Sequence, residues 1–377
     1  MKRILMLLML VLCLLFFGVQ AAWALDIEAA AAILIDAGSG RVLFEQDART
    51  RLPVASVTKI LTALVVLEHF NDLQQTFTLP EDYVNVGEAG IYLEAGETHT
   101  IEDLLYALML PSANDAAQAL ALATAGSEQA FAQMMNARCA ALGLRDSNWT
   151  NPHGLHHNEH LTTAYDVAFI TREALKIPKF NSIIVTASHT LPWPGKENDR
   201  VISGHNRLLL QYEGADGVKT GYTSKAGQCL VGSATRNGIR LIGVILNSEE
   251  RYEQMAVLLD YGFDNYEMRQ VISFGEVAAK LPVIDAKEDN VSILYGGNVR
   301  LFMRKGLEYQ PQPIIELPAS LQTPVYRDEP AGRALFDDGM GNMTVVDLYP
   351  AADMEYYTFW SVVRIAYQRI LQVLLIK

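Results

Sequence analysis

Residues 217–247 read GVKTGYTSKAGQCLVGSATRNGIRLIGVILN, and their pattern decides the fold. Three apolar or alternating runs, 217–221, 228–235 and 240–247, are separated by turns that contain glycine. Runs of this length joined by such short turns predict consecutive antiparallel strands. These strands are expected to form the main sheet of the first domain.

A β-hairpin and several helices precede these strands. Residues 31–35 and 41–44 are β-like runs on either side of the turn sequence DAGSG. Helical patterns cover 56–70, 100–111, a stretch from Asp115 onward, 127–142, 163–174 and 252–261, with Gly262 as the predicted stop of the last. An antiparallel sheet with flanking helices and a helical insertion predicts an α+β domain over residues 25–270.

The chain changes character from about residue 272 onward. Short β-like runs at 292–295, 299–302 and 343–349 are interrupted by prolines, which predicts a small β-rich domain over 271–352. Residues 353–377 then form a predicted helix with a polar stripe of Ser361, Arg364, Gln368 and Gln372 on an otherwise apolar surface. An amphipathic helix of this kind is expected to lie in the plane of a membrane surface.

The amino terminus has the pattern of a secretory signal. Two basic residues at positions 2 and 3 are followed by an apolar run over 4–19 and by Ala22-Trp23-Ala24. This order predicts a signal peptide over 1–24, cleaved after Ala24. An uncleaved membrane anchor is the alternative, but the apolar run is short for a span. We therefore expect an exported protein, located at the outer face of the cytoplasmic membrane, in the periplasm or in the cell-wall space.

Composition excludes some partners. The sequence has 30 basic and 43 acidic residues, a formal net charge of −13, whereas nucleic-acid binding requires a basic surface. Nucleic acid is therefore not expected as a partner. Outside the predicted signal peptide the cysteines are Cys139 and Cys229. One disulfide is compatible with export, and two buried free thiols are the more usual arrangement.

Three short motifs occur in order along the chain. Residues 56–59 read SVTK, 112–114 read SAN and 219–221 read KTG. Ser56 and Lys59, three residues apart at a helix start, share one face of that helix. A lysine in a dry cleft can lose its proton and activate the serine as a nucleophile, beside the N–H groups of the helix start.

The other two motifs supply polar groups that a substrate needs. Ser112 and Asn114 follow a proline on a loop between helices, which can direct both side chains into one cleft. Lys219 and Thr220 lie on a strand and can hold a terminal carboxylate, while Gly221 lets a substrate backbone approach closely. Each motif alone has an ordinary structural explanation, such as Asn114 capping the next helix. The three motifs together, in this order, are a specific indication of an active site.

The trio and its flanking residues resemble a known family. The trio is typical of serine penicillin-binding proteins and class A β-lactamases. The stretches PVASVTK at 53–59, LPSANDAA at 110–117, NPHGL at 151–155 and GVKTGYT at 217–223 resemble the low-molecular-mass penicillin-binding proteins that act as D-Ala-D-Ala carboxypeptidases. The resemblance covers roughly residues 30–265. It implies a transpeptidase-like catalytic domain, a small β-domain and a membrane-anchoring terminal helix.

The resemblance also implies roles for particular residues. Ser56 would be the acylated nucleophile, Lys59 the general base and Ser112 a proton relay. The substrate would be held by Asn114 at its amide and by Lys219, Thr220 and Gly221 at its carboxylate, with Arg207 nearby. The backbone N–H groups of Ser56 and Tyr222 would form the oxyanion hole. The implied substrate is a peptidoglycan stem peptide ending in D-Ala-D-Ala, β-lactams would be covalent inhibitors, and no cofactor or metal is implied.

Two other functions use the same residues. A serine β-lactamase of class A carries an additional E-x-x-L-N motif for deacylation, and residues 112–219 contain no such motif. A non-catalytic peptidoglycan-binding protein is the second alternative, disfavoured by the intact trio. His153, His156, His157 and His160 lie close together in the sequence, but their spacing is not that of a zinc site. We expect them to occupy a surface loop.

Overall fold

The computed structural model describes residues 25–306, 308, 310–339 and 341–356, together with 363–364, 366–368 and 370–371. The predicted signal peptide and most of the predicted terminal helix lie outside the described residues. In the described part of the chain, no helix combines the length and the apolar character needed to cross a bilayer. The chain forms two compact units.

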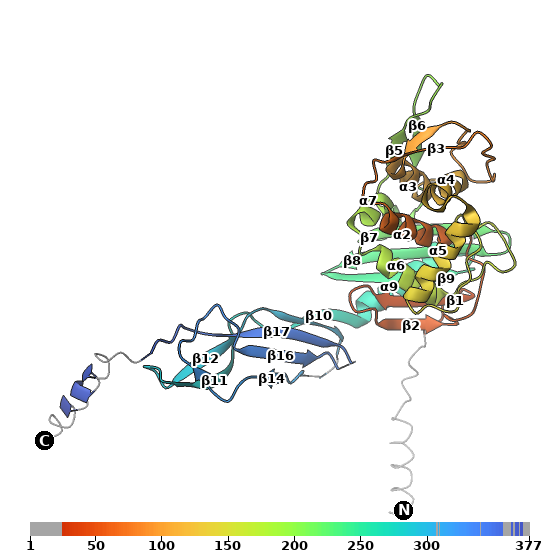
Figure 1. Ribbon diagram of the computed structural model, residues 1–377. Coiled ribbons are helices and arrows are strands. Elements are labelled where there is room, and N and C mark those ends of the chain that lie inside the picture. Colours follow the sequence, from red (N-terminus) through yellow and green to blue (C-terminus); the bar gives the residue numbers. More distant parts are fainter. Residues whose placement is uncertain are drawn as a thin grey trace, which may run out of the picture. The chain divides into compact units, whose positions relative to one another are not determined.

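The first unit is built on a five-stranded sheet of order β2-β1-β9-β8-β7 (Figure 1). The hairpin predicted near the amino terminus is present, with β1 antiparallel to β2 and Ala32 opposite Gln46. The strands β7, β8 and β9 are consecutive neighbours joined by turns of two or three residues, so they must also be antiparallel. The strand bounds are β1 Ala31–Asp36, β2 Val42–Gln46, β7 Ala215–Thr223, β8 Gly227–Arg236 and β9 Ile239–Leu246.

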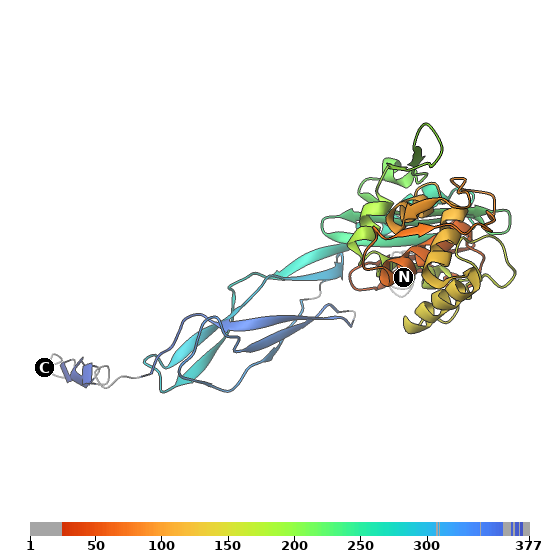
Figure 2. The ribbon, with the colours of Figure 1, turned by 45° about the horizontal axis from the view of Figure 1, so that its top comes forward.

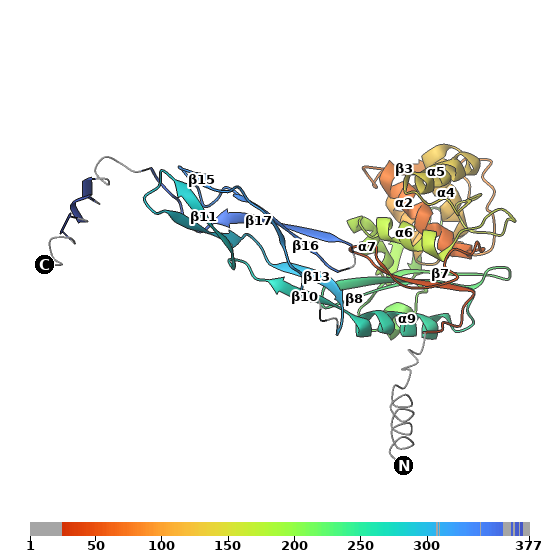
Figure 3. The same ribbon diagram turned by 90° about the horizontal axis from the view of Figure 1, so that it is seen from below.

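Helices cover both faces of this sheet (Figure 3). One face is covered by α9, Arg251–Asn265, whose Met255 lies close to Gly232 and Gly243 of β8 and β9. A larger group of helices lies on the opposite face (Figure 3). This group comprises α2 Lys59–His69, α3 Ile101–Met109, α4 Asn114–Ala125, α5 Glu128–Ala141, α6 Ala164–Ala174 and α7 Pro178–Ile184. This double cover explains why every residue of β1 is buried.

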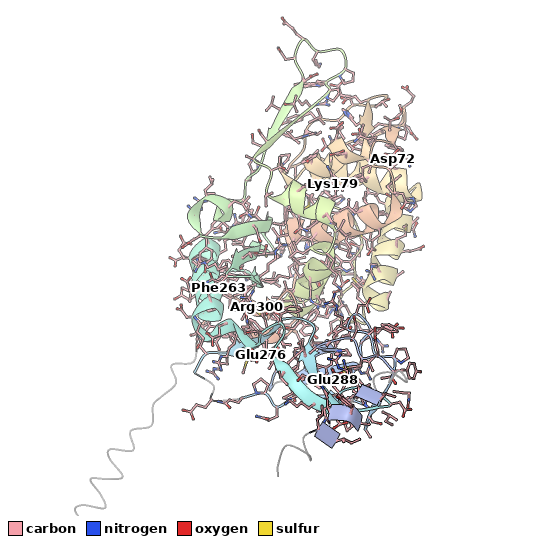
Figure 4. The ribbon with its side chains drawn as sticks, turned by 90° about the vertical axis from the view of Figure 1, so that its left-hand side faces the viewer. Asp72, Lys179, Phe263, Glu276, Glu288 and Arg300 are labelled. Atoms are coloured by element: carbon pink, nitrogen blue, oxygen red, sulfur yellow. The ribbon has the colours of Figure 1, made fainter. Side chains whose placement is uncertain are left out.

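Side-chain caps define several of the helix starts. The hydroxyls of Thr100 and Thr163 accept hydrogen bonds from Asp103 N and Asp166 N, at the positions where the sequence predicts α3 and α6 to begin. The helix α7 was not predicted, because seven residues are too short for a clear periodicity. Its Lys179, labelled in Figure 4, forms an ion pair with Glu102 of α3.

Gly262 does not end the last helix of the first unit, so that expectation is wrong. The helix α9 continues to Asn265 because one glycine costs only about 1 kcal/mol inside a helix, and packing can offset it. The guanidinium of Arg236, for example, lies 4.8 Å from the ring centroid of Phe263. Two small strand pairs and the short helix α8, Leu208–Gln211, also escaped prediction; the pairs are β3 Thr76–Thr78 with β4 Thr98–Thr100, and β5 Ser188–Leu191 with β6 Arg200–Ser203.

The second unit is β-rich, as the sequence predicts (Figure 2). Its larger sheet has the order β14-β16-β17-β12-β11-β15, and β10 pairs with β13. Alternate residues of these strands, among them Ile293, Leu301 and Phe336, meet in one apolar core. The strands are β10 Tyr266–Ile272, β11 Val277–Ile284, β12 Asn290–Tyr295, β13 Val299–Arg304, β14 Ile314–Glu316, β15 Leu321–Gln322, β16 Gly332–Asp337 and β17 Met343–Pro350.

Candidate active site

The predicted nucleophile lies in a strained turn. Residues Ala55–Thr58 form a 3-10 turn that leads into α2, so Ser56 precedes the α-helix and does not lie in its first turn. Ala55 has φ +50°, a left-handed value that costs free energy for any residue other than glycine. The turn still places Ser56 and Lys59 together, with Lys59 Nζ 3.0 Å from Ser56 Oγ.

Lys59 is fully buried, with 0% of its surface exposed. Its Nζ atom also lies 2.7 Å from Asn114 Oδ1 and 2.8 Å from the carbonyl oxygen of His153. Burial, followed by the charge of Lys219, holds the pKa of Lys59 well below its ordinary value. A neutral amine keeps two N–H groups for Asn114 and His153 and directs its lone pair at the Ser56 hydroxyl. This geometry suits a general base.

The S-x-N segment lies against the same lysine. Ser112 adopts φ +65°, and its buried Oγ has no hydrogen-bond partner among the described residues. Asn114 begins α4 and donates its side-chain amide to Gly87 O at 3.1 Å, while its backbone N donates to Ala89 O. The structure therefore holds Asn114 firmly and leaves the Ser112 hydroxyl available to a reacting group.

The strand β7 lies beside the nucleophile turn. A Cβ atom built on Gly221 would lie 2.8 Å from Val54 O and 3.2 Å from Ser56 N, so only glycine permits this approach. The Ser56 amide is therefore close to the strand that continues into Tyr222, whose side chain is 67% exposed. A pocket next to this strand is lined by Lys219 and Thr220 together with Leu110, His205 and Asn206.

Lys219 is the second buried lysine of the site, 2% exposed. Its Nζ donates to Thr220 O at 3.0 Å. Burial, with a smaller contribution from the charge of Arg251, lowers the pKa of Lys219 to about 7. Near neutral pH this amine is poised to take a proton when an anionic group enters.

An arginine that the sequence did not single out lies beside the K-T-G strand. Arg251 Nη1 donates to Gly221 O at 3.0 Å and to Cys229 O at 3.3 Å. Arg207, the arginine singled out in the sequence, is exposed, and its guanidinium stacks 4.7 Å from the ring centroid of Tyr252. Arg251 belongs to none of the sequence motifs. It reaches β7 only because α9 packs against the sheet in the folded chain. A role of Arg207 in carboxylate binding stays a prediction.

Two further groups support the site from behind. The buried carboxylate of Asp115 accepts hydrogen bonds from Ile91 N and Leu93 N, which fixes the loop that carries Gly87 and Ala89. On the other side, the loop from Thr150 to His160 supplies His153 O to Lys59 and Pro152 O to Thr62. Asp115 lies in the stretch 110–117 and Pro152 and His153 lie in the stretch 151–155, both of which carry the family resemblance, but their supporting contacts could not be predicted.

The surface-loop expectation for the histidines is only half right. His153 and His160 are buried, with the His153 ring beside Glu128 and the His160 ring against Thr58, while His156 and His157 are exposed. Within the described residues, no group of three or more His, Cys, Asp or Glu side chains is arranged to hold a metal ion. Cys139 and Cys229 are buried free thiols.

The comparisons with known proteins agree with this arrangement. Residues 18–250 match the family described as D-alanyl-D-alanine carboxypeptidase, peptidase S11, and residues 266–356 match the C-terminal domain of penicillin-binding protein 5. The D-alanyl-D-alanine carboxypeptidase DacF of Bacillus subtilis is 31% identical over 316 residues, which cover 81% of this chain and 80% of that protein.

Solved structures share the fold. A peptidoglycan synthesis regulatory factor, PBP3, from Streptococcus pneumoniae is 27% identical with a TM-score of 0.72, covering 88% of this chain and 100% of its own. The Streptomyces K15 DD-transpeptidase is 32% identical with a TM-score of 0.60, covering 64% of this chain and 98% of its own. This chain belongs to the peptidase S11 family of D-alanyl-D-alanine carboxypeptidases, among the low-molecular-mass penicillin-binding proteins.

Proposed function

We propose that the protein removes the terminal D-alanine from peptidoglycan stem pentapeptides through an acyl-enzyme on Ser56. The observation that carries the proposal is the contact of a fully buried Lys59 amine with the Ser56 hydroxyl at 3.0 Å. Burial holds the pKa of this lysine well below its ordinary value, which favours the neutral amine and so supplies a base without a histidine. The family and its named relatives support the choice of substrate.

The positions of the side chains support the following course of acylation. Lys59 takes the proton of Ser56, and Ser56 Oγ attacks the carbonyl carbon of the penultimate D-Ala. The N–H groups of Ser56 and Tyr222 stabilise the resulting oxyanion. The tetrahedral intermediate collapses as its C–N bond breaks, and the proton from Lys59, relayed by Ser112, goes to the amine of the departing D-Ala. Lys219 and Thr220 hold the carboxylate of that residue until it leaves.

Deacylation repeats the same steps with water. A water molecule gives its proton to Lys59 and attacks the ester carbonyl, and Ser56 Oγ leaves with a proton returned from the lysine. A β-lactam enters as a substrate analogue whose leaving group stays tethered after the ring opens. It would therefore form an ester on Ser56 that hydrolyses slowly, which makes these drugs covalent inhibitors in this proposal.

The test is release of D-alanine from a peptide that ends in D-Ala-D-Ala, with mass spectrometry of the penicillin-treated protein. We expect free D-alanine from the parent and an adduct on the peptide that contains Ser56. Ser56→Ala should abolish both signals. An adduct on another residue, or D-alanine release by Ser56→Ala at the parental rate, would overturn the assignment.

The location of the protein is a separate proposal. The basic, apolar and A-x-A pattern over residues 1–24 supports export, and the polar stripe of residues 353–377 supports attachment to the membrane surface. Deletion of residues 355–377 should release active enzyme from membranes into the soluble fraction. Persistence of the truncated, signal-cleaved enzyme on membranes would contradict the anchoring role.

A further inference from the structure

A chain of hydrogen bonds runs behind the nucleophile turn. The backbone N of Thr150 donates to Nδ1 of His160 at 3.1 Å, and Nε2 of His160 lies 2.9 Å from Oγ1 of Thr58. The Thr58 hydroxyl then lies 2.8 Å from the carbonyl oxygen of Ala55. The chain therefore joins the histidine-rich loop to the residue that precedes Ser56.

The chemistry of the two ends fixes every proton in this chain. A backbone N–H can only donate, so His160 Nδ1 must be the acceptor, and the Thr150 hydroxyl, 3.2 Å from the same nitrogen, must then donate to it as well. A carbonyl oxygen can only accept, so the single hydroxyl proton of Thr58 goes to Ala55. Thr58 must then accept from Nε2–H of His160. The contacts specify a neutral imidazole with its proton on Nε2.

The surroundings of His160 favour that neutral form. Its side chain is 2% exposed and lies edge-on to Trp149, with ring centroids 5.3 Å apart. Burial, and then the neighbouring histidines His153, His157 and His156, lower the pKa of His160 to about 3.

The carbonyl held by Thr58 belongs to the same peptide unit as the Ser56 amide. Because a trans peptide is planar, fixing the direction of Ala55 O also fixes the direction of Ser56 N–H, which points the opposite way. Gly154 packs directly against this carbonyl group, since a Cβ atom added at Gly154 would lie 2.0 Å from Ala55 O. This close contact restricts the directions in which the Ala55 carbonyl can point. The left-handed φ of Ala55 shows that this peptide is held against its backbone preference.

We propose that His160 is a positioning residue, which acts through Thr58 to orient the Ala55–Ser56 peptide and so to direct the Ser56 amide at the oxyanion. The inference rests on the proposed function, in which that N–H stabilises the charge that develops during acylation. It also gives a role to one histidine of the cluster, while His156 and His157 of the same loop remain solvent-exposed.

The test compares variants that differ by one hydroxyl. Thr58→Val keeps the shape of the side chain and removes the hydrogen bond to Ala55, whereas Thr58→Ser keeps the hydroxyl. We expect acylation by a fluorescent penicillin to slow by about one to two orders of magnitude in Thr58→Val and in His160→Phe, because small displacements of a catalytic group have effects of this size. Thr58→Ser should stay within a few-fold of the parent, and the exposed control His156→Phe should match it.

Two readouts separate positioning from general loss of structure. Titration of active sites should give the same final fraction of acylated protein in parent and variants, with only the rate reduced. The double variant Thr58→Val/His160→Phe should be no slower than the slower single variant, because both changes break one chain. Fewer reactive sites with an unchanged rate, or additive losses in the double variant, would contradict the inference.

Spectroscopy tests the parent directly if a variant fails to fold. In protein with ¹⁵N-labelled histidine, one imidazole should keep its proton on Nε2 from pH 8 to pH 5 and should disappear from the spectrum in His160→Gln. A His160 signal that titrates near pH 6.5, or that carries the proton on Nδ1, overturns the proposal. If Thr58→Val and His160→Phe are acylated at the parental rate, the role of His160 is contradicted and the proposed function is not affected. If the parent forms no adduct on Ser56, the proposed function is contradicted as well.

Discussion

The Nζ atom of Lys59 lies 3.0 Å from Oγ of Ser56, in a position that solvent does not reach. The two remaining contacts of this amine, to Asn114 Oδ1 and His153 O, come from two segments that both follow α2 in the sequence, and they hold the amine on the serine. Neither acceptor carries a charge, so the cost of burying the lysine is offset by hydrogen bonds to neutral groups and by a lowered pKa, which favours the neutral amine. Burial of Lys59 is therefore what allows it to act as a base toward Ser56.

Replacement of Lys59 tests the role of the neutral amine. Lys59→Arg keeps a positive charge that cannot be lost, and Lys59→Met removes both charge and base. We expect acylation by penicillin to fall by about a thousandfold in both variants, since a general base contributes up to about 10⁴-fold. Stopped-flow fluorescence measures the rate, and circular dichroism confirms the fold. A Lys59→Arg variant that acylates at the parental rate would rule out proton abstraction by this residue.

The pH dependence of substrate capture should follow Lys219. With a pKa of about 7 in the free protein, Lys219 is charged below that pH and loses its proton above it. The kcat/KM for a peptide with a free terminal carboxylate should therefore decline as pH rises through about 7. Lys219→Arg, which keeps its charge, should remove this alkaline limb. A peptide amide lacking the carboxylate serves as the control substrate and should show no such limb in the parent.

Gly154 is expected to be essential for the nucleophile turn. It has φ +87°, and an added Cβ atom would meet Ala55 O at 2.0 Å and Thr58 Oγ1 at 2.8 Å. Gly143 is a matched control, because it has φ +76° but no atom within 4 Å of the added Cβ. Gly143→Ala should lower the free energy of unfolding by about 1–2 kcal/mol and leave acylation unchanged. Gly154→Ala should cost more and also slow acylation; equal effects of the two variants would show that the close contact is unimportant.

Asp115 links the loop over residues 85–93 to the charge balance of the site. Its carboxylate accepts from Ile91 N and Leu93 N, and its charge raises the pKa of Lys59 against the lowering effect of burial. Asp115→Asn should therefore shift the acidic limb of the acylation rate to lower pH and speed hydrogen exchange in the loop. Asp72→Asn, a change at the exposed carboxylate labelled in Figure 4, should alter neither. An unchanged pH profile in Asp115→Asn would refute the electrostatic role.

His160 should make the fold sensitive to acid. Its pKa is about 3 in the folded protein and about 6.5 in an unfolded chain, so only the unfolded chain binds a proton between these values. The stabilisation is fully present above pH 6.5 and is lost as pH falls toward 3, by about 1.4 kcal/mol per pH unit. Urea unfolding of the parent and of His160→Gln between pH 7 and pH 4 measures this difference. Parallel stability curves for the two proteins would show that His160 titrates normally.

Local sequence determined most of the fold of the first unit. The hairpin at the amino terminus, the three strands around K-T-G and the starts of α3 and α6 follow from alternation, glycine turns and threonine caps, which act within a few residues. The errors have a common origin. The short elements β3 to β6, α7 and α8, and the continuation of α9 past Gly262, depend on packing against distant segments, which no local pattern encodes.

The candidate site divides in the same way. The sequence by itself determined which residues carry the chemistry, because Ser56 and Lys59 must share a face when they lie three apart at a helix start, and because the motifs at 112–114 and 219–221 supply the polar groups. Only the tertiary structure decided their environment: Arg251 beside β7, Asp115 beneath the loop over residues 85–93, and His160 behind Thr58. Hydrogen bonds and desolvation depend on atoms brought together from far apart in the chain, so the burial that lowers the pKa of Lys59 could be seen only once the chain was folded.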